Sequence, residues 1–460
     1  MKSYIKINIS NGKQKAILVL TLLLLCLAFA YRSKMPGMNL QNQLNDQLVV
    51  EWYNLFLNAE RSSEGYRGPI AARTMGYIGL AGFEAAMPLI GLSYQSFAET
   101  HMHLKLPIYD SDKKFQLLAA LNACYKKLFD KFYITTTSNE QILAEQLYQK
   151  WENKLKSIAE KNICEDSRKF GTDIATAVFE FSATDSMGHQ AYLHIYDRHY
   201  IPKAGEGCWK VSEEIPMPPL LPHWGEVRPF VIRTSDFVAS PLPEYSLFAT
   251  SIFYTEALEV LTVSSPLSVE NKWIAEFWSD DHPGITFTPA GRWISITNQV
   301  IEKECPPIEK TLETYLKMGI ALTDGSIACW NSKYLFNLER PETYIHKVFD
   351  KNWYPLFHTP PFPSYPSGHS VFGAAAAEVL THMFGPNYQM KDNSHIGRDE
   401  FMGKPRMFHS FYDMAFENAF SRIPLGVHFR MDCEEGLRMG FQIGKKVAAL
   451  ELMKPKYSVQ

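Results

Sequence analysis

The sequence lacks the features that several large protein classes need. It has seven cysteines in 460 residues and no Cys-x-x-Cys pair, so cysteine spacing predicts neither a zinc site nor a disulfide framework. A Walker loop, a Rossmann glycine fingerprint and a zinc-protease helix are all missing from the sequence. After residue 30 no apolar run approaches about 18 residues, so we expect no membrane span beyond the N-terminal segment.

An excess of basic charge is also lacking. The formal net charge is -3, which gives no reason to expect a nucleic-acid partner. Hydrophobic residues make up 46% of the chain and aromatic residues 13%, which is typical of a compact protein with a large buried core. Composition does not predict the oligomeric state.

The N-terminus has the pattern of an export signal. The first 15 residues are basic, Ala16 to Ala30 are apolar, and Ala28-Phe29-Ala30 has the small-x-small pattern of a signal-peptidase site. We therefore expect a signal peptide at 1–30 and export to the periplasm or the cell exterior. An uncleaved N-terminal membrane anchor is the alternative, and Cys26 gives a weak hint of lipidation.

Helical spacing dominates the rest of the chain, which predicts an all-α fold. Leu143, Leu147, Trp151 and Leu155 recur every four residues, and Ser138 with Gln141 resembles a capping box. We expect an N-terminal helical bundle at 31–200 and a C-terminal helical domain at 246–460. Eight prolines fall between Pro202 and Pro243, so 201–245 is predicted to be an ordered Pro-rich connecting segment.

Three short segments carry residues suited to bind an oxyanion. The first holds Lys333 and, seven residues later, Arg340-Pro341. Seven residues are two helical turns, so we expect both cations on one helix face before Pro341 ends the helix. Taken alone, this spacing is also common on a solvated helix face.

The second segment is Pro366-Ser367-Gly368-His369, followed by a run rich in alanine. It predicts a helix whose unpaired N–H groups and positive dipole end point at an anion, with Gly368 allowing close approach. An ordinary turn with a capping serine is the simpler reading of these four residues alone.

The third segment runs from Ser421-Arg422 to His428 and Asp432. If the chain is helical from Val427 to Gly436, the Asp432 carboxylate can hold one nitrogen of His428 and leave the other for the anion. An i,i+4 surface pair is the alternative. The nearby Asp280-Asp281-His282 precedes Pro283-Gly284 and predicts a turn rather than a catalytic triad.

Together the three segments resemble the signature of the type 2 phosphatidic acid phosphatase and vanadium haloperoxidase superfamily. They read Lys-x6-Arg-Pro, Pro-Ser-Gly-His and Ser-Arg-x3-Gly-x-His-x3-Asp. Flanking residues at 289–293, 324–333 and 361–365 are similar to the soluble haloperoxidase-like branch, and the resemblance spans about 224–450. It implies that the C-terminal bundle is of this type.

The resemblance implies a vanadate-dependent haloperoxidase that oxidises halide with hydrogen peroxide. Its alternative is an acid phosphatase that hydrolyses phosphomonoesters through a phosphohistidine, without vanadate. By the resemblance, His428 is the axial vanadium ligand or the phosphatase nucleophile, Asp432 is its partner, and His369 is the acid–base group. The oxygens of vanadate or phosphate would be held by Lys333, Arg340, Ser367, Gly368 and Arg422, and Lys333 would also act in catalysis.

Phe362 stands where halide preference varies within the resembled family. An aromatic residue there resembles chloride-oxidising members, whereas histidine resembles bromide-oxidising members. A core phenylalanine that lines a pocket wall is the more ordinary reading. Phe362 is therefore a candidate for halide specificity.

Overall fold

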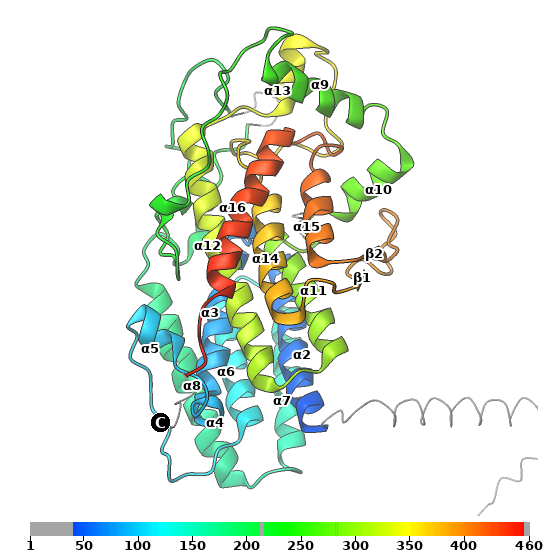
Figure 1. Ribbon diagram of the computed structural model, residues 1–460. Coiled ribbons are helices and arrows are strands. Elements are labelled where there is room, and N and C mark those ends of the chain that lie inside the picture. Colours follow the sequence, from blue (N-terminus) through cyan, green and yellow to red (C-terminus); the bar gives the residue numbers. More distant parts are fainter. Residues whose placement is uncertain (1–39, 212–215, 281, 283, 455–460) are drawn as a thin grey trace, which may run out of the picture.

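The computed structural model describes residues 40–211, 216–280, 282 and 284–454. It confirms the all-α prediction, and most helices run along the long axis of an elongated molecule (Figure 1). The helices of the first half are α2 (Leu40–Ser62), α3 (Gly68–Ala85), α4 (Met87–Ile90), α5 (Phe97–Met102), α6 (Leu117–Phe132), α7 (Ser138–Leu155) and α8 (Lys161–Ala183).

The second half of the chain begins at the top of the molecule in Figure 1, where α9 and α13 lie. Its helices are α9 (Ile252–Ser264), α10 (Val269–Phe277), α11 (Pro289–Glu304), α12 (Ile308–Phe336), α13 (Pro341–Val348), α14 (Gly368–Phe384), α15 (Phe411–Phe420) and α16 (Arg430–Ala448). Two strands, β1 (Met390–Asp392) and β2 (Arg406–Phe408), pair antiparallel. The predicted signal peptide at 1–30, with the possible anchor, lies outside the described residues.

Helix ends follow the local sequence, with one correction. The prediction that Ser138 caps α7 is wrong by one residue, because the Thr137 side chain accepts the Glu140 N–H and Ser138 is already helical. A serine and a threonine stand side by side here, and either can cap a helix. No helix among the described residues is long and apolar enough to cross a membrane.

The helices α14 and α16 pack closely because α16 presents glycines to α14. A Cβ atom at Gly440 would lie 2.4 Å from the Val371 carbonyl oxygen, and one at Gly436 would lie 2.6 Å from the Ser367 carbonyl oxygen. Larger side chains at these two positions would push the helices apart. This contact fixes the C-terminal helix against the start of α14.

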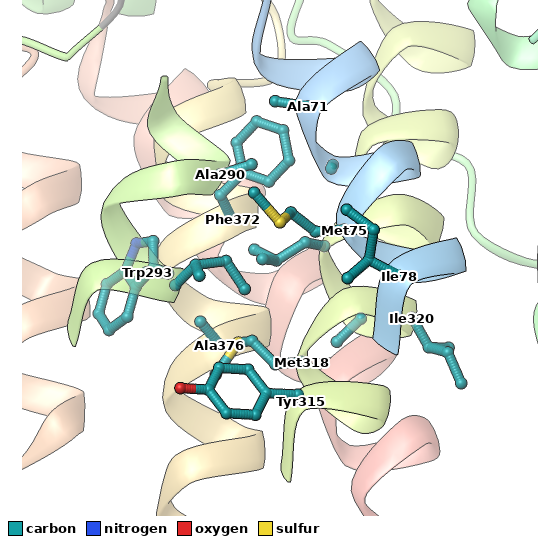
Figure 2. Packing of buried hydrophobic residues seen from close by; sticks show 14 of the residues in the cluster. Ala71, Met75, Ile78, Ala290, Trp293, Tyr315, Met318, Ile320, Phe372 and Ala376 are labelled. Carbon is teal, nitrogen blue, oxygen red and sulfur yellow. The ribbon is translucent and has the colours of Figure 1, made fainter. Parts of the chain in front are cut away.

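One hydrophobic cluster extends from Leu48 on α2 to Leu452 after α16. Figure 2 shows side chains of α3, α11, α12 and α14 meeting in it, among them Met75, Ala290, Met318 and Phe372. The core thus joins helices from both predicted bundles. The boundaries at 200 and 245 stay predictions.

The segment 201–245 includes the short 3₁₀ helices η2 (Trp224–Glu226) and η3 (Thr234–Asp236); a third, η1 (Ala191–Leu193), precedes it. Its described part is fastened to α12, because the buried Asp324 carboxylate accepts the backbone N–H groups of residues 230, 231 and 232 at 2.7 to 3.0 Å. Trp224 also donates from its indole to Ser326. The segment therefore packs on the helix that ends at the candidate site.

Candidate active site

A cavity of about 580 Å3 lies where the three sequence segments meet. His369, Arg422 and His428 line it, although 59 residues separate the two histidines along the chain. The structure thus brings both predicted histidines to one cavity. Gly368 and Phe362 also line it.

Lys333 lies near the end of α12 and is completely buried. Its Nζ donates to the carbonyl oxygens of Pro363 and Ser364, at 3.1 and 2.8 Å. Burial lowers the pKa of Lys333 to about 7, and the nearby positive charge of Arg340 acts in the same direction, so the charge of Lys333 depends on pH near neutrality. The ammonium group is held by neutral carbonyl groups.

The prediction that Lys333 and Arg340 share a helix face is wrong. The left-handed residue Asn337 ends α12, and Arg340 is the N-cap of α13 with Pro341 at the first helical position. The two cations are nevertheless brought to the same site, because both lie against Phe362, with Nζ and Cζ 5.1 and 4.9 Å from its ring centre. Proline starts a helix here instead of ending one.

Arg340 is buried and bonded to backbone oxygens. It donates to the carbonyl oxygens of Phe362 at 3.0 Å and Val427 at 2.8 Å. Its Nη2 is buried and has no hydrogen-bond partner among the described residues. Burial lowers the pKa of Arg340 to about 10, so the guanidinium remains charged at neutral pH.

The helix start predicted at Ser367 is present. Ser367 is the N-cap of α14, its Oγ accepts the Ser370 N–H at 3.4 Å, and Gly368 is the first helical residue. The first N–H groups of a helix have no partner within the helix, and they carry its positive dipole end. A Cβ atom at Gly368 would lie 3.3 Å from the Trp330 ring, so a larger residue would be tight here.

His428 is tied to Asp432 as predicted, but on a different local structure. Helix α16 begins at Arg430, so His428 precedes the helix and Asp432 stands in its first turn. The His428 Nδ1 lies 2.9 Å from the Asp432 Oδ2. Since this contact places the ring proton on Nδ1, the His428 Nε2 accepts from Arg340 Nη1 at 3.2 Å.

His369 is, with His428, one of the two motif histidines that line the cavity. Burial, followed by the positive charges of Arg422, Lys333 and Arg340, holds the pKa of His369 well below its ordinary value. Burial and the same three cations act likewise on the pKa of His428. Both rings are therefore neutral at neutral pH. The His369 Nε2 is buried without a hydrogen-bond partner among the described residues.

These residues fit a multiply charged oxyanion. Lys333, Arg340 and Arg422 each depress the pKa of both histidines, and each donates a hydrogen bond to a neutral backbone oxygen. Unpaired buried donors such as the Arg340 Nη2 are costly unless a ligand satisfies them. An anion would supply both the charge and the acceptors. Lys333, Arg340, Ser367 and Asp432 are not among the residues that line the cavity.

Sequence reasoning missed two contributions. The Ser364 Oγ donates to the Asp432 Oδ2 at 2.5 Å, and the Ser364 carbonyl accepts from Lys333, so this one residue connects two of the three segments. Asp280 and His282, read as part of a turn, line the cavity. Burial raises the pKa of Asp280 to about 7. An aspartate and a histidine two residues apart were the available signal.

Fold and site together define an all-α protein with a buried, cationic site that fits an oxyanion and contains two neutral histidines. Residues 348–454 match the family model described as the VCPO second helical-bundle domain. The family model, the curated relatives and the solved structures all support the vanadium haloperoxidase superfamily.

Two curated relatives match part of the chain. The vanadium chloroperoxidase of Curvularia inaequalis is 28% identical over 280 residues, which are 46% of this chain and 46% of the relative. The vanadium-dependent bromoperoxidase of Ascophyllum nodosum is 33% identical over 104 residues, which are 21% of this chain and 19% of the relative. The matches thus span less than half of the length of these curated relatives.

Solved structures match far more of the chain. The crystal structure of a bacterial vanadium-dependent iodoperoxidase has a TM-score of 0.79 and 29% identity, and covers 90% of this chain and 98% of its own. An apo-type bacterial vanadium-dependent chloroperoxidase has a TM-score of 0.61 at 17% identity, covering 83% of this chain and 93% of its own, which supports the fold alone.

Proposed function

We propose that this protein is a vanadate-dependent haloperoxidase, which oxidises halide with hydrogen peroxide and releases hypohalous acid. The observation that carries the proposal is the pair of neutral histidines among three buried cations at one cavity. Superfamily membership, together with the match to an iodoperoxidase over almost the whole chain, supports the same function.

Vanadate fits the residues present. Lys333, Arg340, Ser367, Gly368 and Arg422 would hold its oxygens, and His428 would bind the vanadium atom through its Nε2. The bound vanadate would supply a Lewis acid that activates peroxide toward attack by halide. The Asp432 carboxylate, itself fixed by the Ser364 hydroxyl, keeps the His428 Nδ1 protonated and orients the ring.

His369 acts as the acid–base group in this proposal. Its ring is neutral because burial and three cations oppose protonation. The negative charge of a bound oxyanion would offset these cations and raise the pKa of His369, so that it can accept the proton that peroxide loses on binding. Buried cations around it would stabilise the negative charge that remains on the peroxide oxygens. The cavity that His369 lines has room for peroxide and halide.

Phosphomonoester hydrolysis is the second candidate. The same His428–Asp432 pair favours it, because an imidazole with an oriented, unprotonated Nε2 is also a nucleophile for phosphoryl transfer. His369 would then protonate the leaving alcohol. Vanadate would inhibit this reaction by occupying the phosphate site, whereas the first proposal requires it.

The two candidates are separated by one set of assays. Purified protein is incubated with orthovanadate, hydrogen peroxide and chloride, bromide or iodide, while a dye reports halogenation; a second sample without vanadate receives an aryl phosphate. We expect vanadate-dependent halogenation and no phosphate release. A folded protein that binds vanadate and yet gives no peroxide-dependent halogenation would rule out the first function.

Phe362 is the residue to vary for halide preference. Its ring lies between the cavity and the cations Lys333 and Arg340, and it contacts Trp330 with ring centres 5.2 Å apart. A Phe362→His variant would place a polar ring there. If Phe362 sets the preference, the ratio of chloride to bromide oxidation falls in this variant.

Export completes the proposal. The basic and apolar character of residues 1–30 supports it. Cell fractionation, with mass spectrometry of the mature N-terminus, tests it: cleavage after Ala30 is expected for a removed signal peptide, and an intact N-terminus for an anchor.

A further inference from the structure

A second cavity, of about 260 Å3, lies in the first half of the chain. It is enclosed by α3, the ends of α6 and α8, and the segment 188–192, and the three helices pack against one another (Figure 1). None of the described residues lines both this cavity and the cavity of the candidate active site. Residues 67–69 line the active-site cavity, whereas Tyr66 and Ile70 line the second one. The chain at the start of α3 therefore separates the two cavities.

Arg73 contributes a guanidinium group to the wall of the second cavity, although only 4% of this residue is exposed. Its Nε donates to the Asp185 Oδ2 at 3.2 Å, and its Nη2 donates to the Ser182 carbonyl oxygen at 2.7 Å. Within the described part of the chain the Nη1 has no hydrogen-bond partner. Asp185 itself does not line the cavity. Arg73 thus keeps a donor available for an acceptor in the cavity.

Lys131 gives the cavity its net charge. It stands in the last turn of α6, and its Nζ lies 5.4 Å from the ring centre of Phe179. The described lining residues include no Asp or Glu, and the Asp185 carboxylate offsets the charge of Arg73. Burial, with the charge of Arg73 acting likewise, lowers the pKa of His189, so this lining ring is neutral at neutral pH. One uncompensated positive charge remains, which favours a monoanion.

Most of the remaining wall is aromatic. Tyr66 and Tyr192 stack with ring centres 5.5 Å apart, and Phe132 meets Phe179 edge-to-face at 5.1 Å. Such rings pack favourably against a further flat ring. An inorganic anion would satisfy the cations but leave these rings in contact with water. The volume is below the ~300 to 1,000 Å3 typical of sites for larger organic ligands, so the occupant is small.

We propose that the second cavity binds a small aromatic monocarboxylate of about benzoate size. Its carboxylate would lie at Arg73 and Lys131, and its ring would lie among the four aromatic side chains. The site is separate from the candidate active site, and the inference does not depend on the proposed function.

Isothermal titration calorimetry with sodium benzoate tests the ligand class. The buffer contains no other carboxylate, and orthovanadate is present so that the oxyanion site is not open to benzoate. We expect saturable binding of one benzoate per chain. Benzamide, which has the ring without the charge, and acetate, which has the charge without the ring, should each bind at least ~tenfold more weakly. Equal affinity for benzoate and either of these compounds overturns the inference.

Two variants test the place of binding. Lys131→Glu should weaken benzoate binding at least ~tenfold, because it replaces an attractive charge with a repulsive one. Ile134→Asp is the second variant, since Ile134 lines the cavity and is 52% exposed, so the fold tolerates a polar residue there. The matched control is Lys445→Glu, because Lys445 is an exposed lysine in the last turn of α16 and does not line the cavity.

The control should bind benzoate like the unaltered protein. Lack of saturable binding in the unaltered protein contradicts the inference. So does control-like affinity in both cavity variants when their circular dichroism is native, because benzoate would then bind elsewhere.

Discussion

Arg340 and His369 contribute to the same site in different ways. Arg340 offers a permanent charge and an unpaired Nη2, whereas His369 is a neutral ring that lines the cavity. The charge of Arg340 would contribute to binding of the anion before any reaction. The neutral ring of His369 would contribute only when a proton is transferred. Affinity and turnover should therefore respond to different substitutions.

His369→Ala should lower kcat by ~10²- to 10⁴-fold while vanadate affinity changes by less than about fivefold. Arg340→Ala should instead weaken vanadate binding by at least ~tenfold, because a charge-assisted hydrogen bond is lost. Equilibrium dialysis with orthovanadate and steady-state kinetics measure the two quantities. Arg438→Ala is the control, because Arg438 pairs with Glu435 on α16, away from the cavity. An equal loss of affinity in both variants would contradict the separate roles.

Asp280→Asn should change how stability depends on pH. Burial raises the pKa of Asp280 from 3.8 to about 7, although Arg292 and Arg422 oppose the shift. Between these values the folded protein keeps a proton that the unfolded chain has lost, so this group lowers the free energy of unfolding as pH rises toward 7.

The asparagine variant lacks this ionisable group, so its free energy of unfolding relative to the unaltered protein should rise by a few kcal/mol as pH increases from 3.8 to about 7, given ~1.4 kcal/mol per pKa unit. Urea unfolding at several pH values measures it. A difference that stays constant across this range would mean that Asp280 is ionised in the folded state.

The sequence predicted the chemistry of single residues, but it did not predict which of these residues contact one another. The motif residues His369, His428 and Arg422 do share one cavity, because residue type and spacing reflect what an anion needs. Ser364 was missed because a serine between prolines has no pattern of its own. Its role depends on a hydrogen bond to Asp432, which lies 68 residues further along the chain.

At the level of helices, the site depends on how α16 is seated on α14. The Asp432 carbonyl accepts the Ser367 N–H at 2.9 Å, so the first turns of both helices are joined at the site. Below that point the backbones approach closely at Gly440. Any shift of α16 would be transmitted to His428, which directly precedes it.

Gly440→Leu should destabilise the fold by ~1 to 3 kcal/mol or more, since overpacking forces the two backbones apart. It should also weaken vanadate binding, although Gly440 does not line the cavity. The control Lys445→Leu places the same side chain on the exposed face of the same helix. Chemical unfolding and vanadate dialysis are the measurements, and two variants with equal stability would argue against tight α14–α16 packing.

Helix existence was predictable, but the role of proline was not. Helical patterning predicted α12 and α14, and the structure buries most residues of both helices in the core. Pro341 was read as the end of a helix, and it begins α13 instead, because proline lacks the N–H that the first helical residue does not need. Asn337, in a left-handed conformation, is what ends α12.

For the whole molecule, the continuous core is the decisive feature. Helix α3 from the predicted N-terminal bundle packs along α12, with Gly319 of α12 so close that a Cβ atom there would lie 2.7 Å from the Gly76 Cα. The two halves of the chain were predicted as separate bundles because single-chain periodicity shows which face of a helix is buried and not which helix covers it.

A fragment of residues 246–460 should therefore fail to fold cooperatively, because removal of α3 exposes the buried face of α12. Near-ultraviolet circular dichroism and urea unfolding of this fragment are compared with those of residues 31–460. We expect a broad transition and weak aromatic signals for the fragment. A sharp transition with native-like spectra would establish 246–460 as an independent domain.

The anchoring of α14 by α16 also has a consequence during protein synthesis. Lys333 and Arg340 leave the ribosome about 90 to 100 residues before Asp432. Until α16 packs on α14, Arg340 lacks its contact with His428 and the start of α14 lacks its hydrogen bond to Asp432. At that stage the nascent chain contains Lys333 and Arg340 but not the complete site for an anion. Under the proposed function, vanadate can therefore bind only after α16 (Arg430–Ala448) has been synthesised and has packed on α14.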